Sequence, residues 1–253
     1  MTSTNFTFNG ITSESMGIYL VRTSGGMVTT PFVPSREIKD DFPFKAKQPY
    51  HFGIQNQQQT IPLTSSTLTN DMTDSKMKEI ADWLFQDEYM EFYSEDNTDK
   101  IYYLMAVSET PRILNASKEG YIEVQFKSKF PYALMASTTP TYEVTGSDTI
   151  SIDNESNTSK YFFPIMEITV GTPAIDVTIT NTSDSSRLTS FGGLTTGEVI
   201  YVDNNKKQII SDLDNLLYDD FNKNWLRFIQ GNNSLDIVGN CTIEFRIQYP
   251  IFT

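Results

Sequence analysis

The sequence predicts a mostly β protein built from two domains. Apolar and polar residues alternate with a period of two along several segments, and short turns rich in Gly, Asn and Pro separate these segments. Only one stretch has helical spacing. The length of 253 residues suits one large or two ordinary domains, and a hydrophobic content of 38% is enough for a buried core.

The chain opens with a predicted β-hairpin. Phe6 and Phe8 alternate with polar residues, and the dipeptide Asn9-Gly10 follows them. Asn-Gly is favoured in two-residue hairpin turns because both residues tolerate a positive φ. Further along, Gly17 would allow a bulge or a close approach of the backbone.

The clearest strand covers residues 121–130. Ile122, Val124 and Phe126 share one face of it, and the residues between them are polar. A slip of one residue would turn the apolar face to water, so the register is well specified. Residues 241–249 repeat this pattern, with Cys241 in phase with the apolar residues. Further strand candidates cover residues 161–170, 175–181, 198–203 and 233–238.

A domain boundary is predicted after the first of these strands. Phe130 is followed by a proline, which cannot donate to a ladder, and then by a stretch of small and polar residues. We predict an N-terminal domain over residues 1–133, a linker over 134–139 and a C-terminal domain over 140–253. In the C-terminal domain, strands recur every 8–12 residues, which favours a sandwich or jelly roll.

One segment is predicted to be an amphipathic helix. Its apolar residues are spaced at i, i+3, i+4, i+7 and i+8, and they are Met77, Ile80, Ala81, Leu84 and Phe85. Acceptors and negative charge just upstream, including Thr73, suit a helix N-terminus. Trp83 lies at the edge of this stripe. It either lies half over the sheet or contacts a neighbouring subunit.

The charge excludes several classes of partner. There are 19 Lys and Arg residues against 32 Asp and Glu residues, which gives a net charge of −13. A chain with this negative charge is a poor candidate for binding the phosphate backbone of a nucleic acid or an anionic lipid. No apolar run approaches the roughly 20 residues that span a bilayer, and we expect neither membrane insertion nor a secretory signal.

The sequence contains little that could perform chemistry, and we assign no catalytic, cofactor-binding or metal-binding residue. The single histidine, His51, is expected in a strand or loop, and the single cysteine, Cys241, is expected to be buried. Two alternatives stay open. Paired carboxylates would suit a glycan hydrolase, and exposed aromatics such as Tyr201 or Trp225 would suit a carbohydrate-binding module that recognises the bacterial surface.

Residues 6–11 and 15–20 resemble the start of the distal tail proteins (Dit) of siphophages. That family opens with an aromatic-x-aromatic-Asn-Gly hairpin followed by Ser-x-x-(Met/Leu)-Gly-Ile. The helix with its Trp83-Leu84 step, and the segments 177–182, 197–203 and 231–237, continue the similarity over most of the chain. The sequence is most similar to the Dit proteins of Bacillus siphophages.

The resemblance implies a structural role. Dit proteins have a β-sandwich-like, ring-forming N-terminal domain with one α-helix and a galectin-like or carbohydrate-binding-module-like C-terminal jelly roll. They form a homo-hexamer, or two hexamers back to back, at the distal end of the tail in the virion, after synthesis in the host cytoplasm. The implied partners are the tail tube protein, the tape measure protein and a hub, fibre or receptor-binding protein, and DNA passes through the channel without specific binding.

A closed ring needs two different contact patches on every subunit. Edge strands and long loops can supply such patches by β-augmentation, so we expect the segments 6–19 and 25–34 to take part. The candidate interface residues are Phe6, Phe8, Asn9, Gly10, Gly25, Gly26 and Trp83. The negative charge would either repel DNA inside the channel or serve solubility alone.

Overall fold

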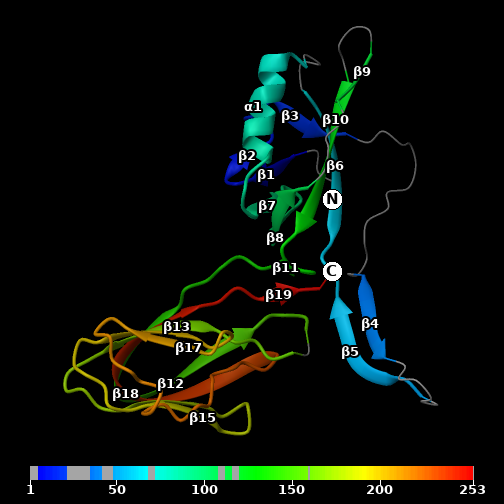
Figure 1. The fold of residues 1–253 in the computed structure, drawn as a ribbon. Coiled ribbons are helices and arrows are strands. Elements are labelled where there is room, and N and C mark those ends of the chain that lie inside the picture. Colours follow the sequence, from blue (N-terminus) through cyan, green and yellow to red (C-terminus); the bar gives the residue numbers. More distant parts are fainter. Residues whose placement is uncertain are drawn as a thin grey trace. The chain divides into compact units, whose positions relative to one another are not determined.

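The computed structural model divides the chain into two compact units, which Figure 1 shows as ribbons. It describes residues 5–21, 35–41, 48–67, 72–107, 112–115, 120–158 and 160–252. Unit 1 contains Met1–Met135 and Ile251–Thr253, and unit 2 contains Ala136–Pro250. The break between the units falls at the start of the predicted linker, whereas the return of Ile251 to unit 1 was not predicted. No helix in the described part of the chain is long and apolar enough to cross a membrane.

The described residues of unit 1 form a ten-stranded antiparallel sheet, one helix and a separate two-stranded hairpin. The main path of the sheet runs through β2 (Ile11–Thr12), β1 (Phe6–Phe8), β7 (Met90–Ser94), β8 (Asn97–Ala106), β10 (Gly120–Ser128), β6 (Thr60–Thr67) and β3 (Ile18–Leu20). Three short strands pair beside this path: β9 (Arg112–Leu114), β11 (Ala133–Leu134) and β19 (Pro250–Ile251).

The first hairpin has the predicted turn. Phe8 pairs with Ile11, and the two residues between them, Asn9 and Gly10, have φ angles of 51° and 72°. Positive φ at both central residues matches the right-handed twist of the flanking strands. The turn therefore directs β2 back along β1 and leaves Asn9 and Gly10 exposed.

The alternation predicted for residues 121–130 is confirmed in β10. Ile122, Val124 and Phe126 are buried, and the strand ends at Ser128, two residues earlier than predicted. The Ser128 hydroxyl donates a hydrogen bond to the Phe130 carbonyl and turns the backbone away from the ladder. Burial of three large apolar side chains on one face fixes this central strand against the core.

The predicted helix is α1 (Asp74–Leu84), and Thr73 caps its N-terminus by accepting a hydrogen bond from the Lys76 N–H. Its buried residues are Ile80, Trp83 and Leu84. Placing Trp83 at the edge of the apolar stripe was therefore wrong, since it is part of the buried face.

Two residues of the predicted apolar stripe, Ala81 and Phe85, remain exposed. They line an apolar groove of about 280 Å³ between α1 and β10. Arg112, which also lines the groove, forms an ion pair of 2.8 Å with Asp74. The apolar stripe of α1 is thus wider than the part of the helix that the sheet covers.

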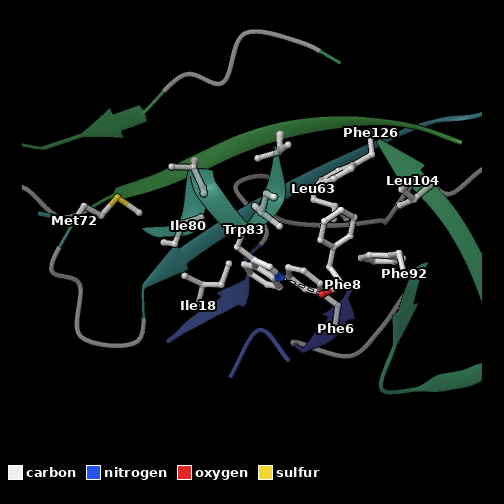
Figure 2. Packing of buried hydrophobic residues seen from close by; sticks show 13 residues of the cluster. Phe6, Phe8, Ile18, Leu63, Met72, Ile80, Trp83, Phe92, Leu104 and Phe126 are labelled. Atoms are coloured by element: carbon white, nitrogen blue, oxygen red, sulfur yellow. Dashed lines mark hydrogen bonds between the residues drawn. The ribbon is translucent and has the colours of Figure 1, made fainter. Parts of the chain in front are cut away.

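The core of unit 1 is built around aromatic side chains from β1, α1, β7 and β10 (Figure 2). The ring of Phe6 stacks on that of Trp83 with centroids 5.7 Å apart, and it lies 5.4 Å from Phe92. Phe8 lies 5.4 Å from Phe126. These pairs add specific ring contacts to the burial of apolar area, so they join the N-terminal strand tightly to the helix.

Unit 2 is a seven-stranded antiparallel sheet. Its main path runs through β15 (Arg187–Phe191), β14 (Val177–Asn181), β18 (Gly231–Arg246), β13 (Ile165–Val170), β16 (Val199–Asp203) and β17 (Gln208–Ser211), and β12 (Thr141–Asn154) also pairs with β18. The turn at Asp203 closes the β16–β17 hairpin, because its carboxylate accepts the N–H groups of Asn205 and Lys206.

Two strands that were predicted separately in unit 2 form one continuous strand. Residues 233–238 and 241–249 were expected as separate strands, but β18 is continuous from Gly231 to Arg246. Gly239 stands in its middle, with a φ of +156°. A Cβ atom there would lie 3.1 Å from the Val177 side chain, so glycine permits both the conformation and the close approach of β14.

Candidate assembly interface

The hairpin of β4 (Arg36–Asp41) and β5 (Tyr50–Asn56) is the most exposed apolar element of unit 1 among the described residues (Figure 1). The exposed fractions are 73% for Phe52, 63% for Ile38, 62% for Tyr50 and 56% for Ile54. Ile38 pairs with Ile54, and side chains at alternate positions of a strand share a face. Ile38 and Ile54 therefore share a face, but a register shift between Ile38 and Asp40 interrupts the alternation before Phe52 and Tyr50. What the four side chains share is their exposure on this one hairpin.

Polar contacts join the two strands of the hairpin. His51 Nδ1 lies 2.6 Å from the Asp40 carboxylate in a cross-strand pair. The carboxylate of Glu37 accepts hydrogen bonds from Lys39 and from the Gln57 side-chain amide. These contacts hold the two strands together, and the four large apolar side chains of the hairpin stay exposed.

The base of the hairpin is anchored to β10. Gln57 donates its backbone N–H to the Ser35 carbonyl over 2.7 Å, which closes the hairpin. The next residues bind the end of β10: the Gln58 side chain donates to the Lys129 carbonyl, and the Gln59 backbone N–H donates to the Ser128 hydroxyl over 2.8 Å. Because β5 runs into β6 through these residues, the sheet fixes where the hairpin begins.

The predicted interface residues fall into three groups. Asn9 and Gly10 are exposed, and they remain candidates. Gly25 and Gly26 lie outside the described residues, like the rest of segment 25–34. The third group contains Phe6, Phe8 and Trp83, which are buried in the core of unit 1.

For this third group the prediction needs correction. Residues that are 5% exposed or less have almost no side-chain surface left for a neighbouring subunit, because the core of their own unit covers it. The exposed hairpin was missed instead. Its signal was the alternation in Tyr50-His51-Phe52-Gly53-Ile54, which indicates a strand but not whether anything covers its apolar residues.

Of the residues considered for chemistry, His51 lies exposed in β5 and Cys241 is buried in β18. Within the described residues, no group of three or more His, Cys, Asp or Glu side chains could hold a metal ion. Cys241 is buried, as predicted, and burial raises the pKa of its thiol to about 11. At neutral pH such a thiol stays protonated, which suits a packing role rather than a nucleophile.

The aromatic side chains considered for sugar stacking are partly covered. Trp225 is half-buried, and its ring meets that of Phe221 edge-on with centroids 4.8 Å apart. Tyr201 is half-buried in β16. The exposed ring of Tyr161 carries the guanidinium group of Arg227 on one face at 3.6 Å. These contacts explain the rings of Trp225 and Tyr161 as parts of the fold.

Comparison with known proteins identifies the family. Residues 1–129 match the phage tail protein N-terminal domain, and residues 132–247 match the phage tail C-terminal domain. The chain belongs to this family of phage tail proteins. Together the two matches cover nearly all of the sequence, so the family assignment holds for both units.

One relative and two solved structures are similar to the chain over most of its length. The tail protein is 29% identical over 248 residues to the SPbeta prophage-derived uncharacterized protein YomH of Bacillus subtilis strain 168, with 96% of each chain covered. Its fold matches the crystal structure of the SPP1 Dit protein with a TM-score of 0.68 and 12% identity, over 97% of this chain and 98% of the other. The phage P2 baseplate in its activated conformation aligns at a TM-score of 0.47 and 9% identity, over 92% and 90%.

These matches confirm the resemblance to Dit proteins and the predicted fold class. The tail protein is mostly β, with curled sheets like those of SPP1 Dit. The family models support a structural role in the phage tail and a location in the tail of the virion.

Proposed function

We propose that the tail protein assembles into a hexameric ring at the tail tip and joins the tail tube to the host-adsorption apparatus. The fold of SPP1 Dit, a protein described as a paradigm of the hub adsorption apparatus in phages infecting Gram-positive bacteria, supports this role. The observation that carries the proposal is the group of exposed apolar side chains on the β4–β5 hairpin. Four large side chains there remain more than half exposed, which is costly unless another subunit covers them.

In the ring, the hairpin of each subunit contacts the next subunit in the same rotational sense. Such a contact is heterologous, since the hairpin of one copy meets a different surface of its neighbour. Unit 1 forms the ring, and unit 2 serves as a mount for the hub, fibre or receptor-binding protein. The tail tube and tape measure proteins meet the other side of the ring. The function is structural rather than catalytic.

The acidic composition suits a channel for DNA. With a net charge of −13 per copy, a ring of six copies surrounds DNA without attracting its phosphates. DNA then passes through without specific binding. This part of the proposal is tested by DNA binding at low salt, where the assembled protein should retain no duplex DNA.

The oligomeric state tests the proposal directly. We expect six copies, or twelve, by light scattering of the purified chain, and closed rings in electron micrographs. Replacing Phe52 and Ile54 with serine should give a monomer with an unchanged circular dichroism spectrum, because both side chains are exposed in the single chain. The matched control replaces Val107 and Ile113 with serine in the same way. Both are exposed elsewhere in unit 1, and this variant should remain oligomeric.

The outcomes separate the two parts of the proposal. A wild-type protein that stays monomeric at high concentration contradicts ring assembly. A hexamer that survives the double substitution at Phe52 and Ile54 contradicts the role of the hairpin and leaves the ring standing.

A further inference from the structure

The loop after β17, residues 212–220, holds aliphatic side chains out in solvent. Leu216 is 87% exposed, the highest value among the large hydrophobic side chains of the described residues, and Leu213 is 50% exposed. Tyr218 on the same loop is also exposed, whereas Leu217 is buried. Single exposed leucines are ordinary on protein surfaces, but here two leucines and a tyrosine are exposed within six residues of one loop.

A buried carboxylate fixes the first half of this loop. Glu198 is fully buried, and its two oxygens accept hydrogen bonds from the Ser211 hydroxyl at 2.5 Å, the Asn215 side chain at 3.0 Å and the Thr195 N–H at 2.9 Å. The Ser211 hydroxyl in turn accepts the N–H of Leu213. Residues on both sides of Leu213 are therefore tied to one buried group.

The second half of the loop is fixed as well. The Tyr218 hydroxyl accepts the N–H of Ile209 over 3.0 Å. Just after the loop, Phe221 is buried and stacks on Phe191 with ring centroids 5.0 Å apart. A loop fixed at both ends keeps Leu216 extended into water, and a binding partner would lose little free energy in ordering it.

The charge around the leucines is negative. Exposed carboxylates flank them at Asp212, Asp214, Asp219 and Asp220. Among the described residues, none of these four lies within ion-pair distance of a Lys or Arg nitrogen. Of the neighbouring lysines, Lys206 pairs with Asp203, and Lys207 and Lys223 border the loop in sequence. The loop thus combines apolar contact area with unpaired negative charge.

We infer that residues 212–220 form a docking site for a protein segment that carries Lys or Arg together with aliphatic side chains. Complementary charge steers such a segment to the loop, and the leucines supply the apolar contact. Anionic lipid and nucleic acid would be repelled. A second copy that met this loop with its own loop would bring the same four carboxylates, so that contact is disfavoured as well.

The test uses the full chain with labelled leucine methyl groups and a short peptide that alternates Lys and Leu. We expect the methyl resonances of Leu213 and Leu216 to shift on titration, and binding to weaken as salt rises from about 0.05 to about 0.5 M. Peptides that alternate Glu with Leu, or Lys with Ser, should bind about tenfold more weakly or not at all, because each lacks one of the two contacts.

Variants locate the site. Leu216→Ser, and the double change Asp212→Asn with Asp214→Asn, should each weaken binding of the Lys-Leu peptide about tenfold. The matched controls are Leu188→Ser, at another exposed leucine of unit 2, and Asp148→Asn with Asp153→Asn, at exposed carboxylates of β12. These controls should bind like the wild type.

Several results would overturn the inference. The first is the absence of any methyl shift with about millimolar peptide, which corresponds to binding weaker than any specific contact. The second is equal loss of binding in the control variants, which would indicate general attraction to an acidic protein. The third is leucine-dependent binding to phosphatidylcholine vesicles, which would make the loop a lipid contact. Ring assembly has no bearing on these readouts, so the inference stands or falls separately from the proposed function.

Discussion

The indole N–H of Trp83 donates a hydrogen bond to the backbone carbonyl of Phe8 over 3.0 Å (Figure 2). The two residues are 75 positions apart in the sequence and belong to α1 and β1. A buried indole N–H needs a partner, and here that partner is the carbonyl just before the Asn9-Gly10 turn. The contact therefore joins the helix, the first strand and its turn in one buried arrangement.

Replacing Trp83 with phenylalanine should destabilise unit 1. The change leaves the Phe8 carbonyl without its donor and removes part of a stacked ring, so we expect a loss of about 2–3 kcal/mol in the free energy of unfolding. Urea unfolding followed by circular dichroism measures this loss. The matched control is Trp225→Phe, where a half-buried ring is replaced and the loss should stay below about 1 kcal/mol. Equal losses in the two variants would contradict the role of the hydrogen bond.

The two units should unfold independently. The chain has two tryptophans, and one lies in each unit, Trp83 in unit 1 and Trp225 in unit 2. Each single-tryptophan variant therefore reports on one unit by fluorescence. We expect two urea transitions with different midpoints, because each unit has a core of its own. Coincident transitions at every urea concentration would mean that the chain folds as one cooperative body.

Glu198 should make the stability of unit 2 depend on pH. Burial alone would raise the pKa of its carboxyl, but the hydrogen bonds from Ser211, Thr195 and Asn215 outweigh burial and lower the pKa below its ordinary value of 4.5. The folded state thus favours the ionised form, and its contribution is complete above pH 4.5 and is lost as the pH falls through the folded-state pKa.

The variant Glu198→Gln tests this linkage. We expect it to lower the stability of unit 2 at pH 7 by about 1–3 kcal/mol, since a neutral amide cannot accept all three hydrogen bonds as a carboxylate does. Thermal unfolding measured between neutral and acidic pH should show that the difference in stability between the variant and the wild type becomes smaller below pH 4.5. Glu143→Gln, at an exposed residue of β12, serves as the control and should match the wild type at every pH.

Cys241 should be nearly inert in the folded protein. With its pKa raised to about 11, roughly one thiol in a thousand is ionised at pH 8, and burial also hinders access to the sulfur. We expect labelling by a disulfide reagent at pH 8 to be at least about 100-fold slower than in concentrated urea. Because the chain has a single cysteine, every label reports on this site. Rapid labelling without denaturant would show that the site is open.

Local chemistry made part of the fold predictable. The Asn9-Gly10 turn depends only on two residues that tolerate positive φ, and the structure has it. The buried face of β10 follows from alternation alone, because successive side chains of a strand point to opposite sides. Where neighbouring elements decide the outcome, the same reasoning failed. Gly239 looks like a turn residue in the sequence, yet β18 runs straight through it because β14 packs closely against that point.

The sequence by itself determined which side chains share a face, where the helix lies and where the first turn forms, since these depend on the geometry of a few adjacent residues. Only the tertiary structure decided which apolar faces are covered within the chain. Other residues of unit 1 cover Trp83, which lies in the core. Phe52 and Leu216 are equally apolar in the sequence, yet they remain exposed to solvent. The physical reason is that periodicity defines a face, whereas burial depends on what residues distant in the sequence place against it.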